Sequence, residues 1–247
     1  MIYLQMKVIK LNLKGILGII TLCMASLLVG VAYADEPIKI TISNTLHNVQ
    51  FDGEWTFGSE WKNSSYAKFE YDQTDAIILR TAHENKFFYV FIDYLTDFTN
   101  DHIADRAIVC FDGYDTSSAA DESDWCYAVS RGSGNGHTLQ GGSPIYQTSH
   151  FNLVKNHPDF VAHGGTSGEY DRYVARPHAA YEFRIPIEQI GFQDEYGFFV
   201  QVYDGNDNDI KTYPKEFSGK FPQKIPSPVK WGKIVSPDHS ISKYDSQ

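Results

Sequence analysis

The sequence of 247 residues contains no methionine after Met24 and only two cysteines after Cys23. It also lacks the motifs of several enzyme classes. There is no Gly-x-Ser-x-Gly elbow, no His-Glu-x-x-His pair and no glycine-rich loop opening onto a helix, which argues against serine hydrolases, zinc proteases and nucleotide-binding enzymes. Pairs of acidic residues do not indicate a glycosidase, because a chain with 31 acids always contains some pair at a suitable distance. We therefore predict that the protein is not an enzyme.

Basic residues are also scarce. The chain has 21 lysines and arginines against 31 acids and a formal net charge of −10, and residues 35–247 alone carry a net charge of −13. An acidic surface repels phosphate backbones and anionic lipid headgroups, so neither nucleic acid nor an anionic membrane surface is an expected partner. The hydrophobic fraction of 42% is too high for a disordered chain.

The N-terminus has the features of an export signal. It combines three lysines, an apolar run and a small-residue triplet: Lys7, Lys10 and Lys14, Gly15–Val31, and Ala32-Tyr33-Ala34. This order is typical of a signal peptide, so residues 1–34 are expected to be cleaved and residues 35–247 to form an extracellular or cell-surface domain. An uncleaved anchor is the alternative, because the apolar run is long. No second apolar run follows, so no transmembrane segment is expected after removal of the signal.

Two cysteines remain in the exported part. Cys110 and Cys126 each lie in a short apolar run, and an even pair in an exported domain indicates one disulfide. A thiolate metal site is the alternative, but the pair lacks the Cys-x-x-Cys spacing of such sites.

Apolar residues of the exported part recur in short runs bounded by glycine, aspartate, asparagine and proline, without a sustained helical period. Strands are expected at 38–43, 76–83, 87–93, 106–111, 125–130, 138–140, 181–185, 198–203 and 231–235. The segments 112–142 and 150–177 are expected to be mostly long surface loops. The prediction is an all-β, single-domain protein with a two-sheet antiparallel β-sandwich of the jelly-roll or immunoglobulin-like type.

Several local patterns, in their order along the chain, resemble the family 9 carbohydrate-binding modules and the related DOMON-type domains. They are Phe51-Asp52-Gly53 followed by Glu60-Trp61, the strand FFYVFID ending at Asp93, AIVCFD ending at Asp112, YEFRIPIEQIGF from Tyr181 to Phe192, and FFVQVYDGNDND from Phe198 to Asp209 followed by Trp231-Gly232. The resemblance covers roughly Ile38 to Val235. It implies a β-sandwich and a sugar ligand, or haem in some of the DOMON relatives.

Aromatic residues are abundant, with 36 phenylalanines, tyrosines and tryptophans. Sugar rings stack on aromatic faces while neighbouring polar groups bond their hydroxyls. Trp125 and Tyr127 stand beside acidic residues and lead into Arg131, so these three residues are the candidate glycan platform. Trp55, Trp61 and Trp231 are interpreted as core or turn residues.

Two acidic segments are candidate calcium sites. One contains Asp112 and Asp115, and the other contains Asp204, Asn206 and Asn208 at alternate positions, which is the oxygen spacing of a calcium loop. The glycine and glutamate that complete such a loop are absent, so solvated turns are the alternative. Calcium is the expected cofactor, because carboxylate and amide oxygens at such spacing are ligands that it prefers.

Four histidines fall in one polar stretch, at positions 150, 157, 163 and 178, but their spacing matches no metal-binding pattern, and exposed histidines are expected. Haem is disfavoured because the exported part has no Cys-x-x-Cys-His motif and no methionine to act as an axial ligand. The prediction is an exported, non-catalytic protein that binds a polysaccharide or glycan, alone or beside separately encoded glycoside hydrolases. The alternatives are an electron-transfer domain that carries haem and an interaction protein of the cell envelope.

Overall fold

The computed structural model describes residues 36–101, 104–113 and 119–243. The N-terminal segment expected to be an export signal lies outside the described residues, so its cleavage stays a prediction. Within the described ranges, no helix is long and apolar enough to cross a membrane.

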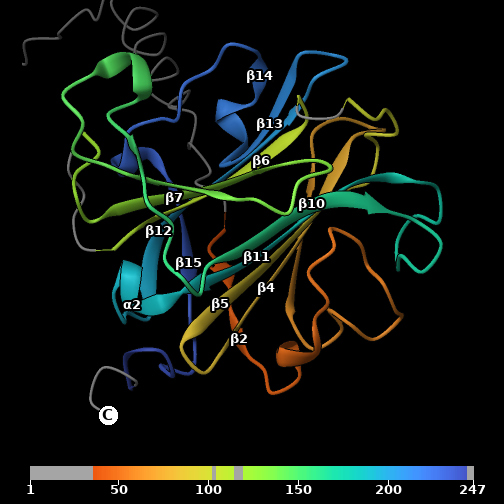
Figure 1. The fold of residues 1–247 in the computed structure, drawn as a ribbon, viewed down its shortest axis with the longest axis horizontal. Coiled ribbons are helices and arrows are strands. Elements are labelled where there is room, and N and C mark those ends of the chain that lie inside the picture. The colour runs from red at the N-terminus through yellow and green to blue at the C-terminus, as the bar shows by residue number, and fades with distance from the viewer. Residues whose placement is uncertain (1–35, 102–103, 114–118, 244–247) are drawn as a thin grey trace, which may run out of the picture. The chain divides into compact units, whose positions relative to one another are not determined.

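The larger of two β-sheets has nine strands in the order β1-β15-β12-β6-β7-β8-β9, with β13 paired to β12 and β14 paired to β13 (Figure 1). Its strands are antiparallel except for the pair of β1 and β15. They are β1 (Ile38–Lys39), β6 (Arg106–Asp112), β7 (Asp124–Ser130), β8 (His137–Gln140), β9 (Asn152–Val154), β12 (Glu195–Asp204), β13 (Asp209–Tyr213), β14 (Gly219–Lys220) and β15 (Gly232–Val235).

The smaller sheet has six strands in the order β10-β11-β5-β4-β2, with β3 also paired to β4. They are β2 (Thr41–Ile42), β3 (Ser65–Glu70), β4 (Ala76–Glu84), β5 (Phe87–Tyr94), β10 (Val161–Ser167) and β11 (His178–Pro186). The helices are short: α2 (Ile187–Ile190) and the 3-10 turns η1 (Leu46–Asn48), η2 (Tyr146–Thr148), η3 (Lys215–Phe217) and η4 (Pro228–Lys230).

The main core lies between the two sheets and takes buried side chains from β4, β5 and β11 on one side and from β6, β7 and β12 on the other. The outer face of the larger sheet is also partly covered, so some strands are apolar on both faces. In β12, Phe198 belongs to the main core, whereas Phe199 packs in a second cluster with Trp231. This double burial explains the nearly continuous apolar runs of the sequence. The expected two-sheet, antiparallel β-sandwich is confirmed.

The expected disulfide between Cys110 and Cys126 is also confirmed. The two residues are paired across β6 and β7 with their Cα atoms 4.0 Å apart, and both side chains are fully buried. The bridge belongs to the second cluster, beside Phe199 and Trp231. It thus cross-links β6 and β7, the two strands of the larger sheet that contribute these cysteines to the cluster.

Replacing both cysteines by alanine is expected to lower the stability by about 3 kcal/mol, because the bridge closes a loop with a sequence separation of 16. For a domain of this size the melting temperature should fall by roughly 6–12 °C. Scanning calorimetry of wild type and double variant, both with and without reductant during unfolding, measures this. An unchanged melting temperature would show that the bridge does not form.

A loop segment packs on the outer face of the smaller sheet and buries two tryptophans, Trp55 and Trp61, as expected for core residues. Glu182 of β11 holds this segment: its carboxylate accepts hydrogen bonds from the backbone N–H of Gly53 at 2.7 Å and from the indole N–H of Trp61 at 3.0 Å. Gly53 has φ of +80°, and a Cβ atom there would lie 2.1 Å from the backbone nitrogen of Gly165. The Asp-Gly turn is therefore required by a close approach of two backbones.

The expectation of a loop over residues 150–177 is wrong in part, because β9 and β10 lie within it. β10 has the sequence VAHGGTS and pairs with β11 over seven residues at the edge of the sheet. Its glycines gave no strand signal. A Cβ atom at Gly164 would lie 2.6 Å from the carbonyl oxygen of Ser130, so close backbone contact selects glycine here over the usual strand residues.

Candidate functional site

One row of residues across the larger sheet leaves a hollow on its outer face. Gly197 of β12 is paired with Asp112 of β6 on one side and with Lys233 of β15 on the other. Side chains of paired residues point to the same face of a sheet, so the missing side chain of Gly197 leaves a space between its two neighbours. A Cβ atom at position 197 would lie 2.9 Å from the Cβ atom of Asp112. The hollow exists because this position is glycine.

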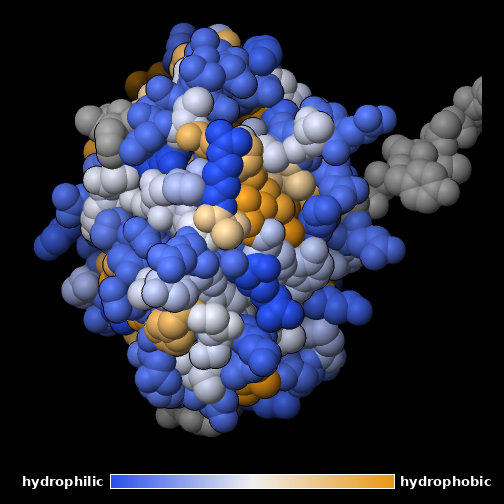
Figure 2. Space-filling view, turned by 90° about the vertical axis from the view of Figure 1, so that its right-hand side faces the viewer, coloured by the Kyte–Doolittle hydropathy of each residue, from blue (hydrophilic) through white to orange (hydrophobic). Residues whose placement is uncertain are grey.

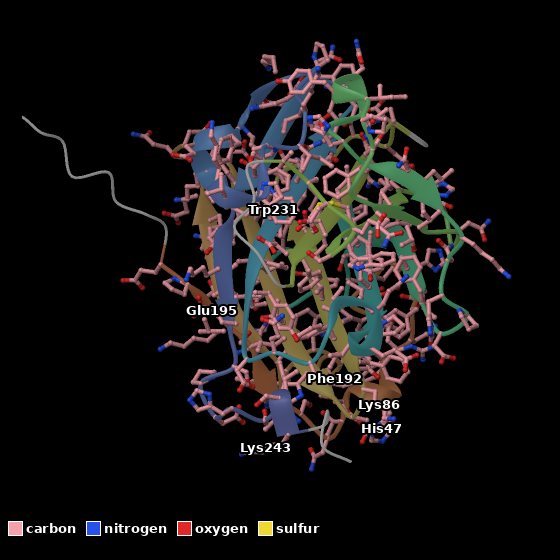
Figure 3. All side chains as sticks on the ribbon, turned by 90° about the vertical axis from the view of Figure 1, so that its left-hand side faces the viewer. His47, Lys86, Phe192, Glu195, Trp231 and Lys243 are labelled. Atoms are coloured by element: carbon pink, nitrogen blue, oxygen red, sulfur yellow. A yellow bond between two sulfur atoms is a disulfide. The ribbon has the colours of Figure 1, made fainter. Side chains whose placement is uncertain are left out.

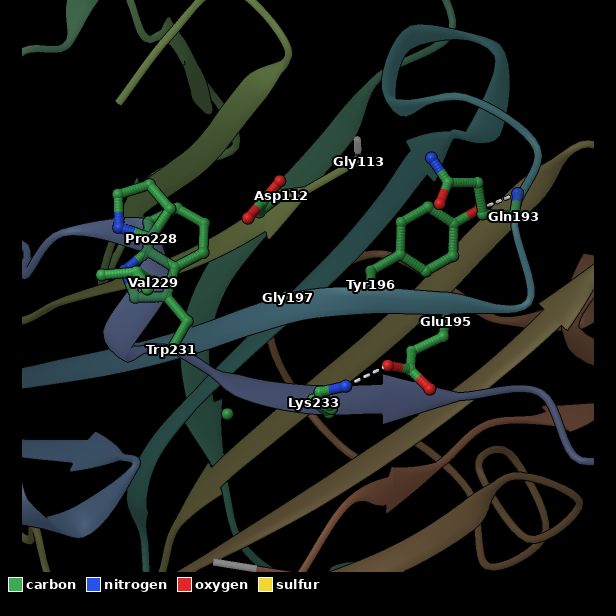
Figure 4. A pocket seen from close by; sticks show the side chains of 11 residues that line it. Asp112, Gly113, Gln193, Glu195, Tyr196, Gly197, Pro228, Val229, Trp231 and Lys233 are labelled. Atoms are coloured by element: carbon green, nitrogen blue, oxygen red, sulfur yellow. Dashed lines mark hydrogen bonds and ion pairs between the residues drawn. The ribbon is translucent and has the colours of Figure 1, made fainter. Parts of the chain in front are cut away.

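Trp231 and the η4 segment before it form one wall of the hollow (Figure 4). The indole ring stacks on Phe151 and Phe199, with ring centroids 6.3 and 6.1 Å away, and its N–H donates a hydrogen bond to the carbonyl of Pro226 at 2.9 Å. The side chain is 8% exposed. These contacts fix the orientation of the ring, so that only a small part of it faces the hollow.

Polar groups line the opposite end (Figure 4). The amide nitrogen Nε2 of Gln193 is buried and forms no hydrogen bond within the described residues. The backbone N–H of Gln193 donates to the hydroxyl of Tyr196 at 2.8 Å, and this hydroxyl donates to the carbonyl of Gly191 at 2.6 Å. Glu195 and Lys233 form an ion pair along the side of the hollow. A buried donor without an acceptor is uncommon in proteins and points to a ligand or water as its partner.

We call this hollow the Trp231 pocket. Its volume is about 330 Å³, at the lower end of the range for small-molecule sites. It is lined by Asp112, Gly113, Gln193, Glu195, Tyr196, Gly197, Pro228, Val229, Trp231, Gly232 and Lys233. Figure 3 shows Trp231 well separated from Lys86 and His47 at the other end of the sandwich. An apolar ring edge, a carboxylate, a charged pair and a free amide thus converge on a space the size of a small ring compound.

The platform expected from the sequence does not form. Tyr127 is fully buried between the sheets, where its hydroxyl donates to Gln189 at 3.0 Å, and Arg131 is 2% exposed. Trp125 is half-buried and packs against the main core. Trp125 and Tyr127 are two residues apart on β7, so both point towards the interior. The platform prediction is wrong for Tyr127 and Arg131, because neither presents a surface to a ligand.

The expected metal ligands are not brought together either. Asn206 and Asn208 are exposed and bond within their own turn, where Asn208 accepts from the hydroxyl of Tyr203 at 2.9 Å. Asp112 lines the Trp231 pocket, and Asp115 lies outside the described residues. The alternate spacing of the loop is that of a hydrogen-bonded turn. Of the four expected ligands that the structure describes, only Asp204 joins an acidic cluster.

This cluster brings Asp204 together with two carboxylates from a segment about 100 residues earlier in the sequence. Carboxylate oxygens of Asp97, Asp105 and Asp204 lie within 4.8 Å of one another, and all three residues are buried. Arg131 reaches Asp105 at 3.4 Å and Asp97 at 3.7 Å. Within the described residues, Oδ2 of Asp97 and the hydroxyl of Tyr181 are buried without a hydrogen bond. Arg131 thus pairs with two of the three buried carboxylates, and one oxygen of Asp97 and the hydroxyl of Tyr181 are left without a hydrogen bond among the described residues.

The electrostatics of the cluster reflect this excess of negative charge. The pKa of Asp97 is raised to about 7, chiefly by burial and also by the neighbouring carboxylates of Asp105 and Asp204, while Arg131 acts to lower it. Burial also raises the pKa of Asp204. A cation in this cluster would favour the ionised carboxylates, as the oxygen ligands of calcium require.

A second group, Asp93, Asp171 and His178, is held together by the imidazole of His178, although Oδ2 of Asp93 is buried without a hydrogen bond to a described residue. His178 is fully buried, contrary to the expectation of exposed histidines, and its Nε2 lies 2.5 Å from Oδ1 of Asp93. Its Nδ1 donates to the carbonyl of Arg176 at 2.6 Å. Because both ring nitrogens are in hydrogen bonds, this group resembles a structural network more than a metal site.

Exposed aromatic and aliphatic side chains elsewhere are dispersed. The most exposed large ones are Ile42, Tyr66, Ile145, Tyr146, Leu153, Tyr170, Phe221 and Val229. Figure 2 shows one face of the molecule, on which a small hydrophobic area is bordered by hydrophilic side chains. On that face there is no broad apolar platform.

The sequence signal for the Trp231 pocket was weak. Gln193 and Glu195 stand in a polar stretch that is typical of a turn, and Trp231 was interpreted as a core or turn residue and not as part of a binding site. Gly197 between Tyr196 and Phe198 was the one available clue, because a glycine inside an apolar strand marks a close approach or an open space.

Comparisons with known proteins concern the fold. No family model matches the chain, and no curated protein matches it. A solved family 9 carbohydrate-binding module from Caldicellulosiruptor kristjanssonii in complex with cellotriose is similar, with 11% sequence identity and a TM-score of 0.47 over 81% of this chain and 93% of that one. The glucose complex has 11% identity and a TM-score of 0.45 over 81% and 95% of the two chains. These modules belong to the family that the sequence resembles.

Proposed function

We propose that this protein is a non-catalytic carbohydrate-binding domain that acts outside the cytoplasm and holds a sugar ring in the Trp231 pocket. The observation that carries the proposal is the unbonded amide nitrogen of Gln193, which lies in a pocket walled by a rigid indole. Sugars present both apolar C–H faces and hydroxyl groups, so a site of this composition can contact a ring and bond its hydroxyls. Asp112 and the Glu195–Lys233 pair supply acceptors and a donor on either side.

The test is a calorimetric titration of the protein with a panel of neutral and acidic oligosaccharides, followed by the Gln193→Met variant. Methionine keeps the length of the side chain but removes the donor, so the affinity should fall about twofold to tenfold for one lost hydrogen bond. The matched control is Gln73→Met, an exposed glutamine in the turn before β4, which should bind as wild type does.

Two outcomes would contradict the proposal. If no saccharide of the panel binds to the folded protein, the carbohydrate function is wrong and an interaction role in the cell envelope becomes the better account. If a saccharide binds equally to wild type and Gln193→Met, the Trp231 pocket is not its site.

We also propose that calcium binds the buried cluster of Asp97, Asp105 and Asp204 and stabilises the fold. Two features of the cluster support calcium. Oδ2 of Asp97 lies 3.7 Å from Arg131 but accepts no hydrogen bond from the described residues, so it can serve as a ligand atom. Oδ2 of Asp101, on the segment that leads to Asp105, is likewise buried without a hydrogen bond. Calcium prefers several carboxylate oxygens, and a bound ion would offset the repulsion among them. Its role here is structural, since Arg131 and the ligands lie beneath the surface.

A further inference from the structure

A second pocket lies on the other side of the η4 segment. It has a volume of about 270 Å³, and we call it the basic pocket. It is lined by Ala119, Ala120, Tyr146, Ser149, His150, Lys224, Ile225, Pro226, Ser227 and Lys230. The stretch from Lys224 to Lys233 supplies both pockets: Lys224 to Ser227 and Lys230 line the basic pocket, whereas Pro228, Val229 and Trp231 to Lys233 line the Trp231 pocket. Because consecutive residues of this one short stretch line both, the two pockets are neighbours.

The charge of the basic pocket is opposite to that of the protein. Lys224, Lys230 and His150 line it, and no acidic side chain of the described residues does. The chain as a whole has a net charge of −10, and the neighbouring Trp231 pocket has two acids and one lysine. Positive groups gathered in a hollow of an acidic protein create a local field that attracts anions.

The two lysines are available to a ligand. Neither Lys224 nor Lys230 takes part in an ion pair between described residues, whereas the lysines at positions 68, 211, 220 and 233 do. The ammonium group of Lys224 lies 3.9 Å from the ring centroid of Tyr146 and donates a hydrogen bond 3.4 Å long to the carbonyl of the same tyrosine, the only hydrogen bond that it forms with a described residue. The tyrosine ring thus positions one charge at the pocket without neutralising it.

The opposite wall of the pocket has a fixed shape. Ser149 and His150 both have left-handed backbone conformations, with φ of 56° and 65°. The carbonyl of His150 accepts from the backbone N–H of Ser143 at 2.8 Å, and Nδ1 of His150 donates to the carbonyl of Ser143 at 2.9 Å. Consecutive non-glycine residues in this region are costly and persist only where surrounding contacts hold them. The hydrogen bond of Nδ1 fixes the orientation of the imidazole of His150 in the wall of the pocket.

We propose that the basic pocket binds an anionic substituent, a sulfate or a carboxylate, of the same glycan whose sugar ring occupies the Trp231 pocket. The ligand of this protein is then an acidic polysaccharide. This inference rests on the proposed carbohydrate function and adds the charge of the substrate to it. Lysine ammonium groups bind such anions as point charges, and the adjacent hydroxyl of Ser149 can donate to them.

The experiment compares polysaccharides that differ in charge, by affinity electrophoresis in native gels. The pairs are dextran and dextran sulfate, hydroxyethyl cellulose and carboxymethyl cellulose, and agarose and κ-carrageenan. At least one anionic member should retard the wild-type protein more than its neutral partner. The Lys224→Gln/Lys230→Gln variant should lose about fivefold of the affinity for that anionic polymer, and the difference between wild type and variant should shrink in high salt.

The matched control is Lys86→Gln, an exposed lysine in the turn between β4 and β5 and far from Trp231 (Figure 3). It removes one positive charge from the same protein without touching either pocket, so it should bind as wild type does. Sodium sulfate added as a competitor shows whether the anion alone occupies the pocket. Weak competition at high concentration is expected, because the free ion lacks the sugar contacts.

Equal retardation by the neutral and anionic members of every pair would overturn the inference, as would an equal loss in Lys86→Gln, which would indicate only general charge attraction. Neither result touches the carbohydrate function if a neutral polymer still binds through the Trp231 pocket. Binding of no polymer by folded protein would remove the carbohydrate function and this inference together. Competition by sulfate at low concentration would mean that the pocket holds a free anion instead of a glycan.

Discussion

Calcium is expected to raise the melting temperature of this protein at pH 8 by roughly 5–10 °C when its concentration is a hundredfold above the dissociation constant. The ion would bind the buried carboxylates of Asp97, Asp105 and Asp204, of which only part of the charge is offset by Arg131. The Asp97→Asn variant should lose this response, because it removes a buried carboxylate whose Oδ2 lies 3.7 Å from Arg131 but accepts no hydrogen bond from the described residues. Scanning calorimetry with calcium and with a chelator measures both.

The pH dependence of the effect has a definite sign. Burial, together with Asp105 and Asp204, raises the pKa of Asp97 from an ordinary value of 3.8 to about 7 in the folded protein. The metal-free protein binds this proton more tightly when folded, so its stability is highest below pH 4 as far as this group is concerned. Stability then falls as the pH rises to about 7, by about 4 kcal/mol at most. Calcium should therefore stabilise the protein more at pH 8 than at pH 5.

The control for the calcium experiment is Asp207→Asn, which removes an exposed carboxylate from the turn after Asp204. This variant should keep the full response to calcium. Without calcium at pH 8, Asp97→Asn should be more stable than wild type, because the buried repulsion is relieved. If wild type melts at the same temperature with calcium and with chelator, the cluster is no calcium site.

Replacing Trp231 by alanine is expected to abolish detectable sugar binding and to destabilise the fold by about 3–5 kcal/mol, since the ring is packed between Phe151 and Phe199. The milder Trp231→Phe variant separates the two effects. It keeps an aromatic ring in the cluster but loses the hydrogen bond to Pro226 and the part of the indole that reaches the pocket. Its affinity for the bound saccharide should fall roughly twofold to tenfold in a calorimetric titration.

Trp55→Phe provides the matched control. Trp55 is buried on the other sheet, and its indole N–H also donates to a backbone carbonyl, that of Phe57 at 2.7 Å. Both phenylalanine variants lose one indole hydrogen bond, so their melting temperatures should fall by similar amounts. Only Trp231→Phe should weaken sugar binding. A loss of affinity in both variants would reflect general destabilisation, and a loss in neither would place the sugar elsewhere.

Particular elements show how far the sequence predicts the fold. Runs of β-branched and aromatic residues bounded by turn formers predicted the strands β4, β5, β6 and β12. The short segment between Pro186 and Gly191 predicted at most one helical turn, which is α2. β10 did not follow, because its glycines are selected by close backbone contacts and not by strand propensity. The disulfide followed from the number of cysteines and their places in two apolar runs. Its exact opposition across β6 and β7 required the register.

The candidate sites divide in the same way. Local spacing made Asp204, Asn206 and Asn208 a calcium loop, whereas the fold uses Asp204 with two carboxylates from other segments. The closeness of Trp125 and Tyr127 to Arg131 in the sequence indicated a platform, whereas the side chains of both aromatic residues face the core between the sheets. Spacing along a strand shows which side chains share a face, but it does not show which of the two faces points into the core. A run that is apolar on both faces gives no signal to decide this.

The sequence by itself determined that the part of the chain that the structure describes forms two β-sheets with one disulfide, and that the chain has a net negative charge. These features follow from periodicity, cysteine number and composition, which are properties of the chain alone. Only the tertiary structure determined which residues come together to form the candidate sites. The hollow above Gly197, the three buried carboxylates and the basic pocket each combine residues from segments far apart in the chain. Strand pairing and register bring such residues together, and neither is encoded in any short stretch of sequence.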